Sequence, residues 1–182
     1  KHLHDNLGIT VIYVTHDQEE AMVMSDRICL MNEGRIEQIG SPADLYFQPN
    51  SIFAADFLGE SNLFAGKVIG QTETGTSIQR VDDIVVSGVC DAEVRNGETT
   101  HYMIRPENIR VHSDETNEDN LIQGKLKETI MMGQLTQYFL ELADGSEMVA
   151  TTLTGSGNDP LQLGDQIYFG WSTRDARIML SS

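Results

Sequence analysis

An apolar run of β-branched residues, positions 9–15 (ITVIYVT), leads directly into His16 and an acidic cluster. A short continuous apolar run is typical of a strand buried on both faces, as in a parallel sheet. In open α/β sheets, ligands bind at the carboxyl ends of the strands. An imidazole at that place can donate a hydrogen bond to a phosphate oxygen or orient a water molecule. An isolated histidine more often satisfies a loop carbonyl, so these residues alone leave both interpretations open.

The elements that must position His16 follow from capping and turn signals. Asp17 stands three residues before Glu20, and this D-x-x-E pattern predicts a helix that ends near Ser25. Beyond it the sequence predicts a hairpin and two short helices, the first starting at Ser-Pro and the second ending at a glycine cap. These three segments are ICLMNEGRIEQIG (28–40), SPADLYFQ (41–48) and SIFAADFL (51–58).

Charge and cysteine content exclude several classes of function. The 182-residue chain carries 28 acidic and 12 basic residues, a net charge of −16, which disfavours binding to nucleic acids or anionic lipid surfaces. Its two cysteines, Cys29 and Cys90, lie far apart, so a thiolate zinc site or a disulfide framework is not expected, and no metal site is predicted. The chain starts at Lys1, and we expect it to be part of a longer protein.

The character of the sequence changes after Gly59, where short β-rich runs alternate with Gly, Asn and Asp. We therefore expect two domains, 1–60 and 61–182, with a small antiparallel β-barrel or sandwich in the second. NLFAGKV (62–68) matches NLIQGKL (120–126), and GETTHYMIRPENIRV (97–111) matches GDQIYFGWSTRDARI (164–178). Because both matches occur in the same order, we interpret them as two copies of one β-unit, about 61–112 and 119–182.

Two groups of apolar side chains in this β-domain are predicted to be buried. Trp171 is expected in the core or in an interface of the second β-unit. Met131 and Met132 are expected to fill gaps in the core. The acidic stretch 115–119 is expected to be a solvated linker.

The region around His16 resembles a known family. THDQEEA, the following SDRI, the hairpin and SPADLY, and then FAADFLGESN, occur in the order typical of the switch-histidine region of ATP-binding-cassette (ABC) import ATPases. In that family a transport-associated OB domain follows the ATP-binding domain, and the duplicated β-unit with its IRPENIRV segment (104–111) resembles it. The variant FLGESNLFAGKV is most similar to the ATPases of spermidine/putrescine importers.

The resemblance implies a fold and a set of functional residues. The fold is mainly β: a duplicated OB-like antiparallel β-barrel or sandwich, preceded by a small α/β remnant of a P-loop NTPase domain. His16 is the catalytic candidate, a γ-phosphate contact that orients water, with Thr15 and Asp17 beside it in the switch loop. Arg105, Pro106 and Glu107 form a charged corner, for which a structural role is favoured over ligand binding.

The resemblance also implies partners and a location. The parent protein uses ATP and Mg²⁺, dimerises with a second ATPase subunit and drives transmembrane permease subunits that a solute-binding protein supplies. It lies in the cytoplasm, peripheral at the inner face of the cell membrane. Its β-domain is regulatory or makes the dimer contact.

Phosphoryl transfer to water also needs a phosphate cradle with its lysine and an aspartate that holds Mg²⁺. No G-x-x-x-x-G-K-[ST] motif and no LSGGQ signature occur in this sequence. We therefore expect that these 182 residues alone are inactive. A strand at 9–15 without sheet neighbours is expected to pair with another copy of the chain, to pack on the β-domain or to be poorly ordered.

Two alternatives stay open. The β-domain can be an effector module that binds a small ligand or oxyanion, and the importer can serve iron, a sugar, glycerol phosphate or thiamine. A nucleic-acid-binding OB barrel is disfavoured, because from Ser61 onward acidic residues outnumber basic ones by eighteen to nine.

Overall fold

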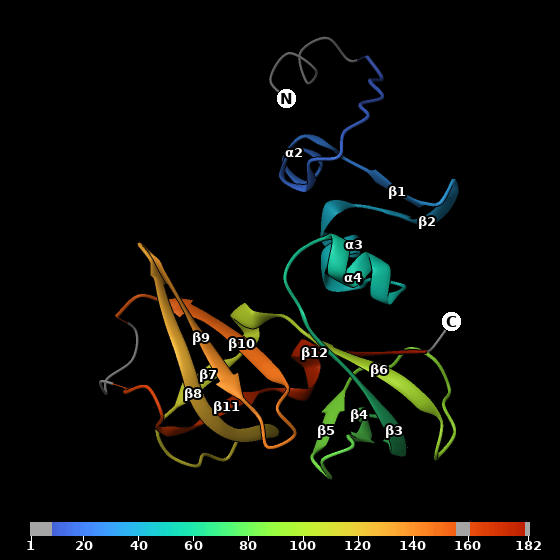
Figure 1. The fold of residues 1–182 in the computed structure, drawn as a ribbon. Helices are drawn as coiled ribbons and strands as arrows, with labels where there is room; N and C mark the ends of the chain where they lie inside the picture. The colour runs from blue at the N-terminus through green and yellow to red at the C-terminus, as the bar shows by residue number, and fades with distance from the viewer. Residues whose placement is uncertain (1–8, 156–160, 181–182) are drawn as a thin grey trace. The chain divides into compact units, whose positions relative to one another are not determined.

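The computed structural model describes residues 9–155 and 161–180. The chain divides into two compact units, Lys1–Gly59 and Glu60–Ser182. The fold is mainly β, which confirms the predicted class, and its helices are short (Figure 1). Within the described ranges, the structure contains no helix with the length and apolarity needed to cross a bilayer.

The described part of the first unit, from residue 9 onward, contains a two-stranded hairpin and three short helices. Asp17 caps the first helix, as predicted, and the backbone of Ser25 closes it. The hairpin turn has positive φ at Glu33 (48°) and Gly34 (79°), the conformation of a type I′ turn. The described elements of this unit are α2 (Gln18–Met24), β1 (Ile28–Asn32), β2 (Arg35–Gly40), α3 (Pro42–Phe47) and α4 (Ile52–Phe57).

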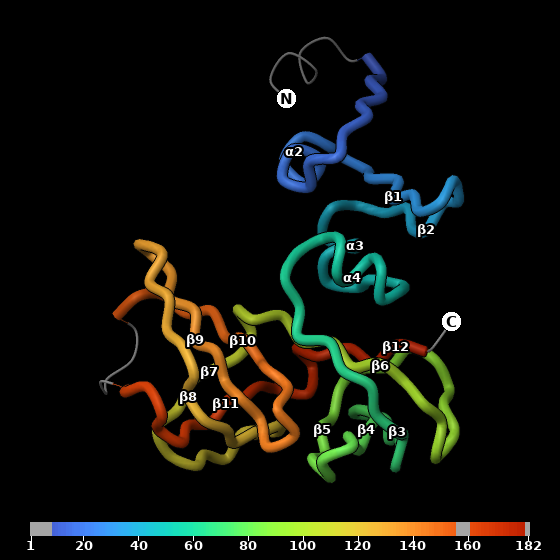
Figure 2. Tube along the Cα trace, viewed as in Figure 1, coloured from blue at the N-terminus to red at the C-terminus, as the bar shows by residue number. Residues whose placement is uncertain are grey.

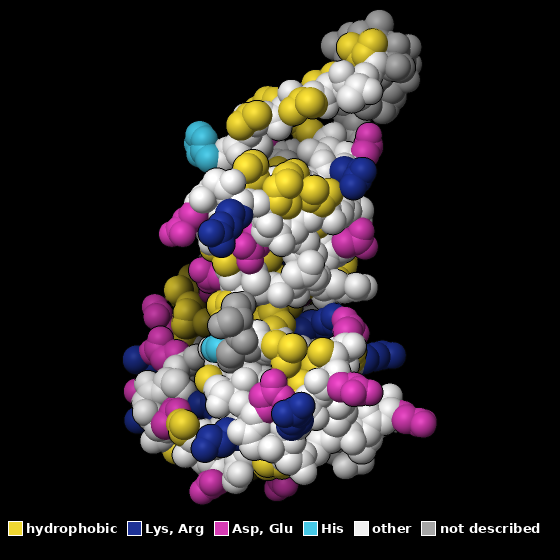
Figure 3. All heavy atoms as spheres, turned by 90° about the vertical axis from the view of Figure 1, so that its right-hand side faces the viewer, with side chains coloured by type: hydrophobic (Ala, Val, Ile, Leu, Met, Phe, Trp, Pro, Cys, Tyr) yellow, Lys and Arg dark blue, Asp and Glu magenta, His cyan; other side chains and the backbone are white. Residues whose placement is uncertain are grey.

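The predicted strand at 9–15 is wrong for this structure. These residues form no helix or strand, and their apolar side chains are exposed, up to 88% at Ile12 and 90% at Val14. A strand needs a neighbour for its backbone hydrogen bonds, and no described strand pairs with this segment. Figure 3 shows the resulting hydrophobic surface on the first unit.

A small core holds the rest of the first unit together. Its buried members come from β1, α3, α4 and the cap of α4: Ile28, Leu30, Leu45, Ala54 and Leu58. Gln38 is buried beside this core and donates through Nε2 to the Gln48 carbonyl at 2.9 Å, while its Oε1 accepts from the Asn50 amide at 2.8 Å. The hairpin is thereby fastened to the connection between α3 and α4.

The described residues of the second unit form two five-stranded sheets, and Figure 1 shows both. Their orders are β5-β4-β3-β6-β12 and β10-β9-β8-β11-β7, with every strand pair antiparallel. The elements are β3 (Asn62–Thr72), β4 (Gly75–Gln79), β5 (Val85–Gly88), β6 (Thr99–Ile104), η1 (Pro106–Asn108), β7 (Arg110–His112), β8 (Asn120–Met132), β9 (Leu135–Glu141), β10 (Glu147–Leu153), β11 (Gln166–Trp171), η2 (Thr173–Asp175) and β12 (Ala176–Leu180).

The two sheets exchange their last strands. The first β-unit supplies β3–β6 and the second supplies β8–β11, in the same relative order. The last strand of the first β-unit, β7, pairs with β11 of the second β-unit, and β12, the last strand of the second β-unit, pairs with β6 of the first β-unit. The tube in Figure 2 shows the red end of the chain beside the light-green β6. Each sheet therefore contains strands of both β-units.

The repeated N-L-x-x-G-K motif has a packing function in both copies. A Cβ atom at Gly66 would lie 2.6 Å from Cδ1 of Ile78, and one at Gly124 would lie 2.6 Å from the carbonyl oxygen of Glu141. The adjacent strand therefore approaches closely at the same point of each β-unit, which is a reason for glycine at both places.

The repeated asparagines join the two β-units. Asn62 donates through Nδ2 to the Val149 carbonyl at 2.8 Å and accepts from the Val149 amide at 2.7 Å. Asn120 does the same with Ser87, at 3.0 and 2.6 Å. Each buried asparagine thus pairs with the third strand of the other β-unit, as a neighbouring strand would.

We expect Asn62→Ala to lower the free energy of unfolding by about 1–3 kcal/mol, because the amide and carbonyl of Val149 lose their partner. Urea unfolding followed by circular dichroism measures this change. Asn117→Ala, at an exposed position in the linker, is the matched control and should shift stability by less than about 0.5 kcal/mol. Equal stability of the two variants would contradict the bridging role.

One apolar core extends across both sheets of the second unit. Trp171 is fully buried in it, as predicted, and donates through Nε1 to the Tyr102 hydroxyl at 2.6 Å. Burial raises the pKa of Tyr102. The prediction for Met131 and Met132 is wrong: they are 71% and 51% exposed, because β8 extends beyond the core into a hairpin with β9.

Candidate functional sites

The switch-loop residues lie where the chain enters α2. His16 is exposed and immediately precedes Asp17, the N-cap residue. Asp17 accepts a hydrogen bond from the Glu20 amide at 3.0 Å, and its own amide donates to Oγ1 of Thr15 at 2.9 Å. The three residues predicted to form the loop therefore share one local hydrogen-bonded turn.

Only half of the predicted capping arrangement forms. The Glu20 carboxylate does not return to the N-cap backbone but accepts from the Tyr13 hydroxyl at 2.8 Å and the Thr15 hydroxyl at 2.9 Å. The hydrogen bond to Glu20 raises the pKa of the Tyr13 phenol. Glu20 thus connects the segment before His16 to the first turn of α2 and sets the path of the chain around the histidine.

The imidazole of His16 points to no partner within the described ranges: none of those residues hydrogen-bonds it. An exposed histidine at a helix start can orient water against a phosphate only if other groups hold that phosphate. The local geometry therefore fits one donor or acceptor of a larger site.

The predicted charged corner, Arg105 to Glu107, places a buried guanidinium beside the first residues of the second unit. Arg105 is 2% exposed, and its Nη1 donates to the Ser61 hydroxyl at 2.6 Å and to the Glu60 carbonyl at 3.1 Å. Pro106 begins η1 and is buried, whereas Glu107 is exposed. The guanidinium fastens the start of β3 to the end of β6.

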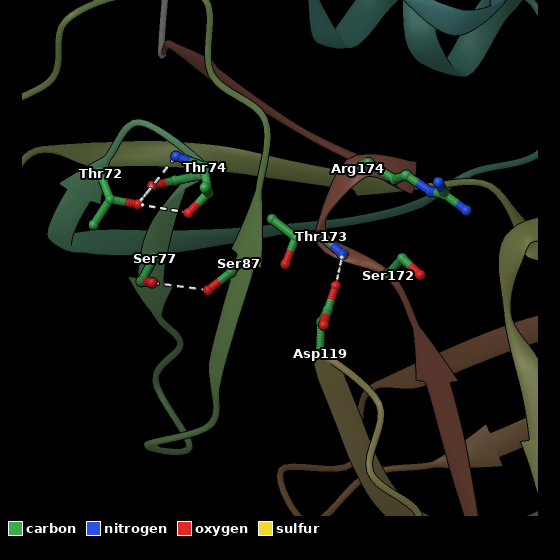
Figure 4. A pocket seen from close by; sticks show the side chains of 9 residues that line it. Thr72, Thr74, Ser77, Ser87, Asp119, Ser172, Thr173 and Arg174 are labelled. Carbon is green, nitrogen blue, oxygen red and sulfur yellow. Dashed lines mark hydrogen bonds between the residues drawn. The ribbon is translucent and has the colours of Figure 1, made fainter.

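A polar cavity in the second unit was not identified from the sequence. Its volume is about 710 Å³, and it lies between the β3–β4 turn, β5, the residue before β8 and η2. Figure 4 shows hydroxyl groups on one side and Asp119 with the start of η2 on the other. Asp119 accepts through Oδ2 from the Thr173 amide at 2.9 Å. One signal of this cavity was present in the sequence. The repeat aligns Arg105 with Ser172, so the second copy lacks the arginine of the first.

The solved structures and family models define the class of the β-domain. Residues 102–179 match the family model described as TOBE domain. The fold resembles the cytoplasmic molybdate-binding protein ModG, solved with molybdate bound, with a TM-score of 0.59. That match covers 66% of this chain and 96% of ModG at 13% identity, so it concerns the fold alone. The chain therefore carries an OB-like TOBE domain.

Curated relatives match nearly the whole length of the chain. The chain is 36% identical to "Spermidine/putrescine import ATP-binding protein PotA" of Rubrobacter xylanophilus, over 98% of this chain and 47% of the relative. It is also 36% identical to the proteins of the same name from Trichodesmium erythraeum (99% and 49% covered) and Thermotoga maritima (97% and 50% covered). The chain spans about half the length of these curated relatives and corresponds to their C-terminal half. The resemblance to ABC import ATP-binding subunits is confirmed.

Proposed function

We propose that the chain is the C-terminal part of the ATP-hydrolysing subunit of an ABC importer for polyamines. The observation that carries this proposal is the match to spermidine/putrescine import ATP-binding proteins over nearly the whole chain, through both units. The switch-loop residues and the TOBE domain lie in the order expected of such a subunit.

In the complete subunit His16 contacts the γ-phosphate and orients the attacking water, with Thr15 and Asp17 fixing its position. ATP and Mg²⁺ require a phosphate cradle and a carboxylate for the metal, groups for which the 182 residues contain no motif. This chain therefore contributes the histidine and the β-domain, and by itself it hydrolyses no ATP. The complete subunit pairs with a second copy and with permease subunits at the inner face of the membrane.

The exposed apolar segment 9–15 is where this unit would join the rest of the ATP-binding domain. Side chains such as Ile12 and Val14 are almost fully exposed, and apolar side chains of this size favour burial. In the complete subunit the segment becomes a strand of a parallel sheet that ends at His16. In the isolated chain the same side chains promote self-association.

Uptake measurements test the proposed solute. Cells in which the gene for this chain is disrupted should lose most ATP-dependent uptake of radiolabelled spermidine and putrescine, and the intact gene should restore it. Uptake of iron, sugars, glycerol phosphate and thiamine, measured in the same cells, provides the comparison. Unchanged polyamine uptake with reduced uptake of one of the other solutes would replace the polyamine assignment.

We expect His16→Ala to lower the ATP hydrolysis rate of the complete transporter by about 100-fold or more, because a water-orienting group acts mainly in the transition state. ATP binding, measured by equilibrium titration, should change by only a few-fold. His101→Ala, on strand β6 of the β-domain, is the control and should retain hydrolysis. A His16→Ala transporter with near-normal hydrolysis would exclude the catalytic role.

We infer a regulatory or dimer-contact role for the TOBE domain. The oxyanion alternative has less support, because the cavity in this domain carries the carboxylate of Asp119, and the whole chain is strongly acidic. A carboxylate on the wall opposes the binding of a second anion.

A further inference from the structure

The duplication provides an internal comparison for the cavity of the second unit. Across the two copies, Arg105 after β6 corresponds to Ser172 after β11, and Ser61 before β3 corresponds to Asp119 before β8. The 3₁₀ turns match as well: the Asn108 amide bonds the Arg105 carbonyl at 3.0 Å, as Asp175 does with Ser172. The same place therefore exists twice with different side chains.

In one copy a guanidinium occupies this place. The Arg105 side chain is buried and reaches the Ser61 hydroxyl at 2.6 Å. The facing positions of β9 and β10, a directly paired couple, are Phe139 and Val149. In this copy the chain's own arginine therefore occupies the place, and the corresponding couple on the paired strands is apolar.

In the other copy the arginine is replaced by Ser172, and the cavity of about 710 Å³ lies there. The facing couple is Ser77 and Ser87, whose hydroxyls are 2.8 Å apart. A carboxylate, Asp119, stands where the closed copy has a serine hydroxyl. The cavity has therefore lost a cation and gained an anion and two hydroxyl groups.

The nearby cations face other groups. Arg110 binds the Glu118 carboxylate at 2.6 and 2.5 Å and is 3.4 Å from the Ser172 hydroxyl. Arg174 lines the opening, but Figure 4 shows its side chain pointing away from the serine pair. Its Nε is 3.8 Å from Asp175. Arg110 is not among the residues that line the cavity, although it interacts electrostatically with Asp119, and the Arg174 side chain is 85% exposed.

We propose that this cavity binds the guanidinium group of a small molecule, which takes the place that Arg105 holds in the other copy. Asp119 supplies the opposite charge and the hydroxyls of Ser77, Ser87 and Ser172 supply further acceptors. Charge-assisted hydrogen bonds from a planar guanidinium to a carboxylate are strong and directional. The volume leaves room for the body of a larger ligand.

Titration of the full 182-residue chain with n-propylguanidinium, an analogue of the arginine side chain, tests the proposal. Amide chemical shifts in ¹⁵N–¹H NMR spectra should change saturably at Ser87, Asp119 and Thr173, with a Kd of about millimolar or below for so small a ligand. Butylammonium, of similar length and equal charge, should bind at least several-fold more weakly. Absence of saturable shifts, equal binding of butylammonium, or tighter binding of sulfate would each overturn the proposal.

Two variants locate the site. Ser172→Arg restores the arginine of the closed copy and should abolish binding, whereas Ser113→Arg adds the same charge on the exposed linker and should preserve it. Asp119→Asn should weaken binding by roughly tenfold or more through loss of the charged acceptor. If Ser172→Arg does not fold, Asp119→Asn alone decides, and unchanged affinity in that variant would overturn the proposal.

Discussion

Replacing Arg80 by methionine is expected to lower the free energy of unfolding by about 3–5 kcal/mol, because it leaves the buried carboxylate of Asp82 without its cation. Arg80 is 6% exposed. Its Nε lies 3.1 Å from Asp82, and its Nη2 lies 3.0 Å from both Asp144 and the Ser146 hydroxyl. The guanidinium also lies 4.4 Å from the ring centroid of Phe64, which adds a cation–π contact.

The effect should be large because Arg80 connects the two β-units. Asp82 belongs to the β4–β5 connection of the first β-unit, and Asp144 belongs to the β9–β10 turn of the second β-unit. The side chain of Asp82 is only 7% exposed, so its charge is poorly solvated once Arg80 is gone. Methionine keeps part of the apolar stem, so the loss is mainly that of the charged head.

Urea unfolding of Arg80→Met measures the change, and Arg174→Met provides the matched control. The Arg174 side chain is 85% exposed, so its replacement should cost less than about 0.5 kcal/mol. A double-mutant cycle with Asp144→Asn should give a coupling energy of about 1 kcal/mol or more. Equal stabilities of the two methionine variants would contradict the role of Arg80.

Local signals in the sequence predicted local structure well. Asp17 and Ser41 cap their helices because the capping interaction lies within four residues of chain. The turn at Glu33-Gly34 is equally local. The prediction of a strand at 9–15 failed for the opposite reason, since a strand depends on neighbours that can lie anywhere in the chain. The predicted burial of Met131 and Met132 was wrong because the apolar character of a residue does not show where a long hairpin extends beyond the core.

The same contrast between local signals and long-range contacts applies to the candidate sites. His16 was recognised because its neighbours along the chain form a motif. The cavity beside Asp119 was missed because four segments that are far apart in the sequence line it, and because the second copy lacks the arginine that the first copy has at this place. The aligned repeat contained that difference, Arg105 against Ser172, but only the structure shows that the first is buried and the second borders a cavity.

The exchange of last strands leads to the second large effect: a chain that ends at Asp175 should not fold its β-domain. Such a chain lacks β12, which pairs along its whole length with β6 of the first β-unit. It loses the buried side chains of Ile178 and Met179, 5% and 7% exposed. Each is worth roughly 1.5–3 kcal/mol, so their joint loss reaches the lower end of the total stability of a domain, about 5–15 kcal/mol, and the loss of the β6 partner strand adds to it.

A chain that ends at Leu180 retains β12 and is the matched control. It should give the same dispersed NMR spectrum and cooperative urea transition as the intact chain, whereas the chain ending at Asp175 should show neither. Retention of a cooperative transition by the shorter chain would show that β6 does not depend on β12. The duplicated sequence suggests two units that fold independently, but the exchanged strands give each unit a sheet that is incomplete without the other. The same exchange places Asp119 and Ser172 of the second β-unit against Ser77 and Ser87 of the first, so the cavity requires both units to be folded.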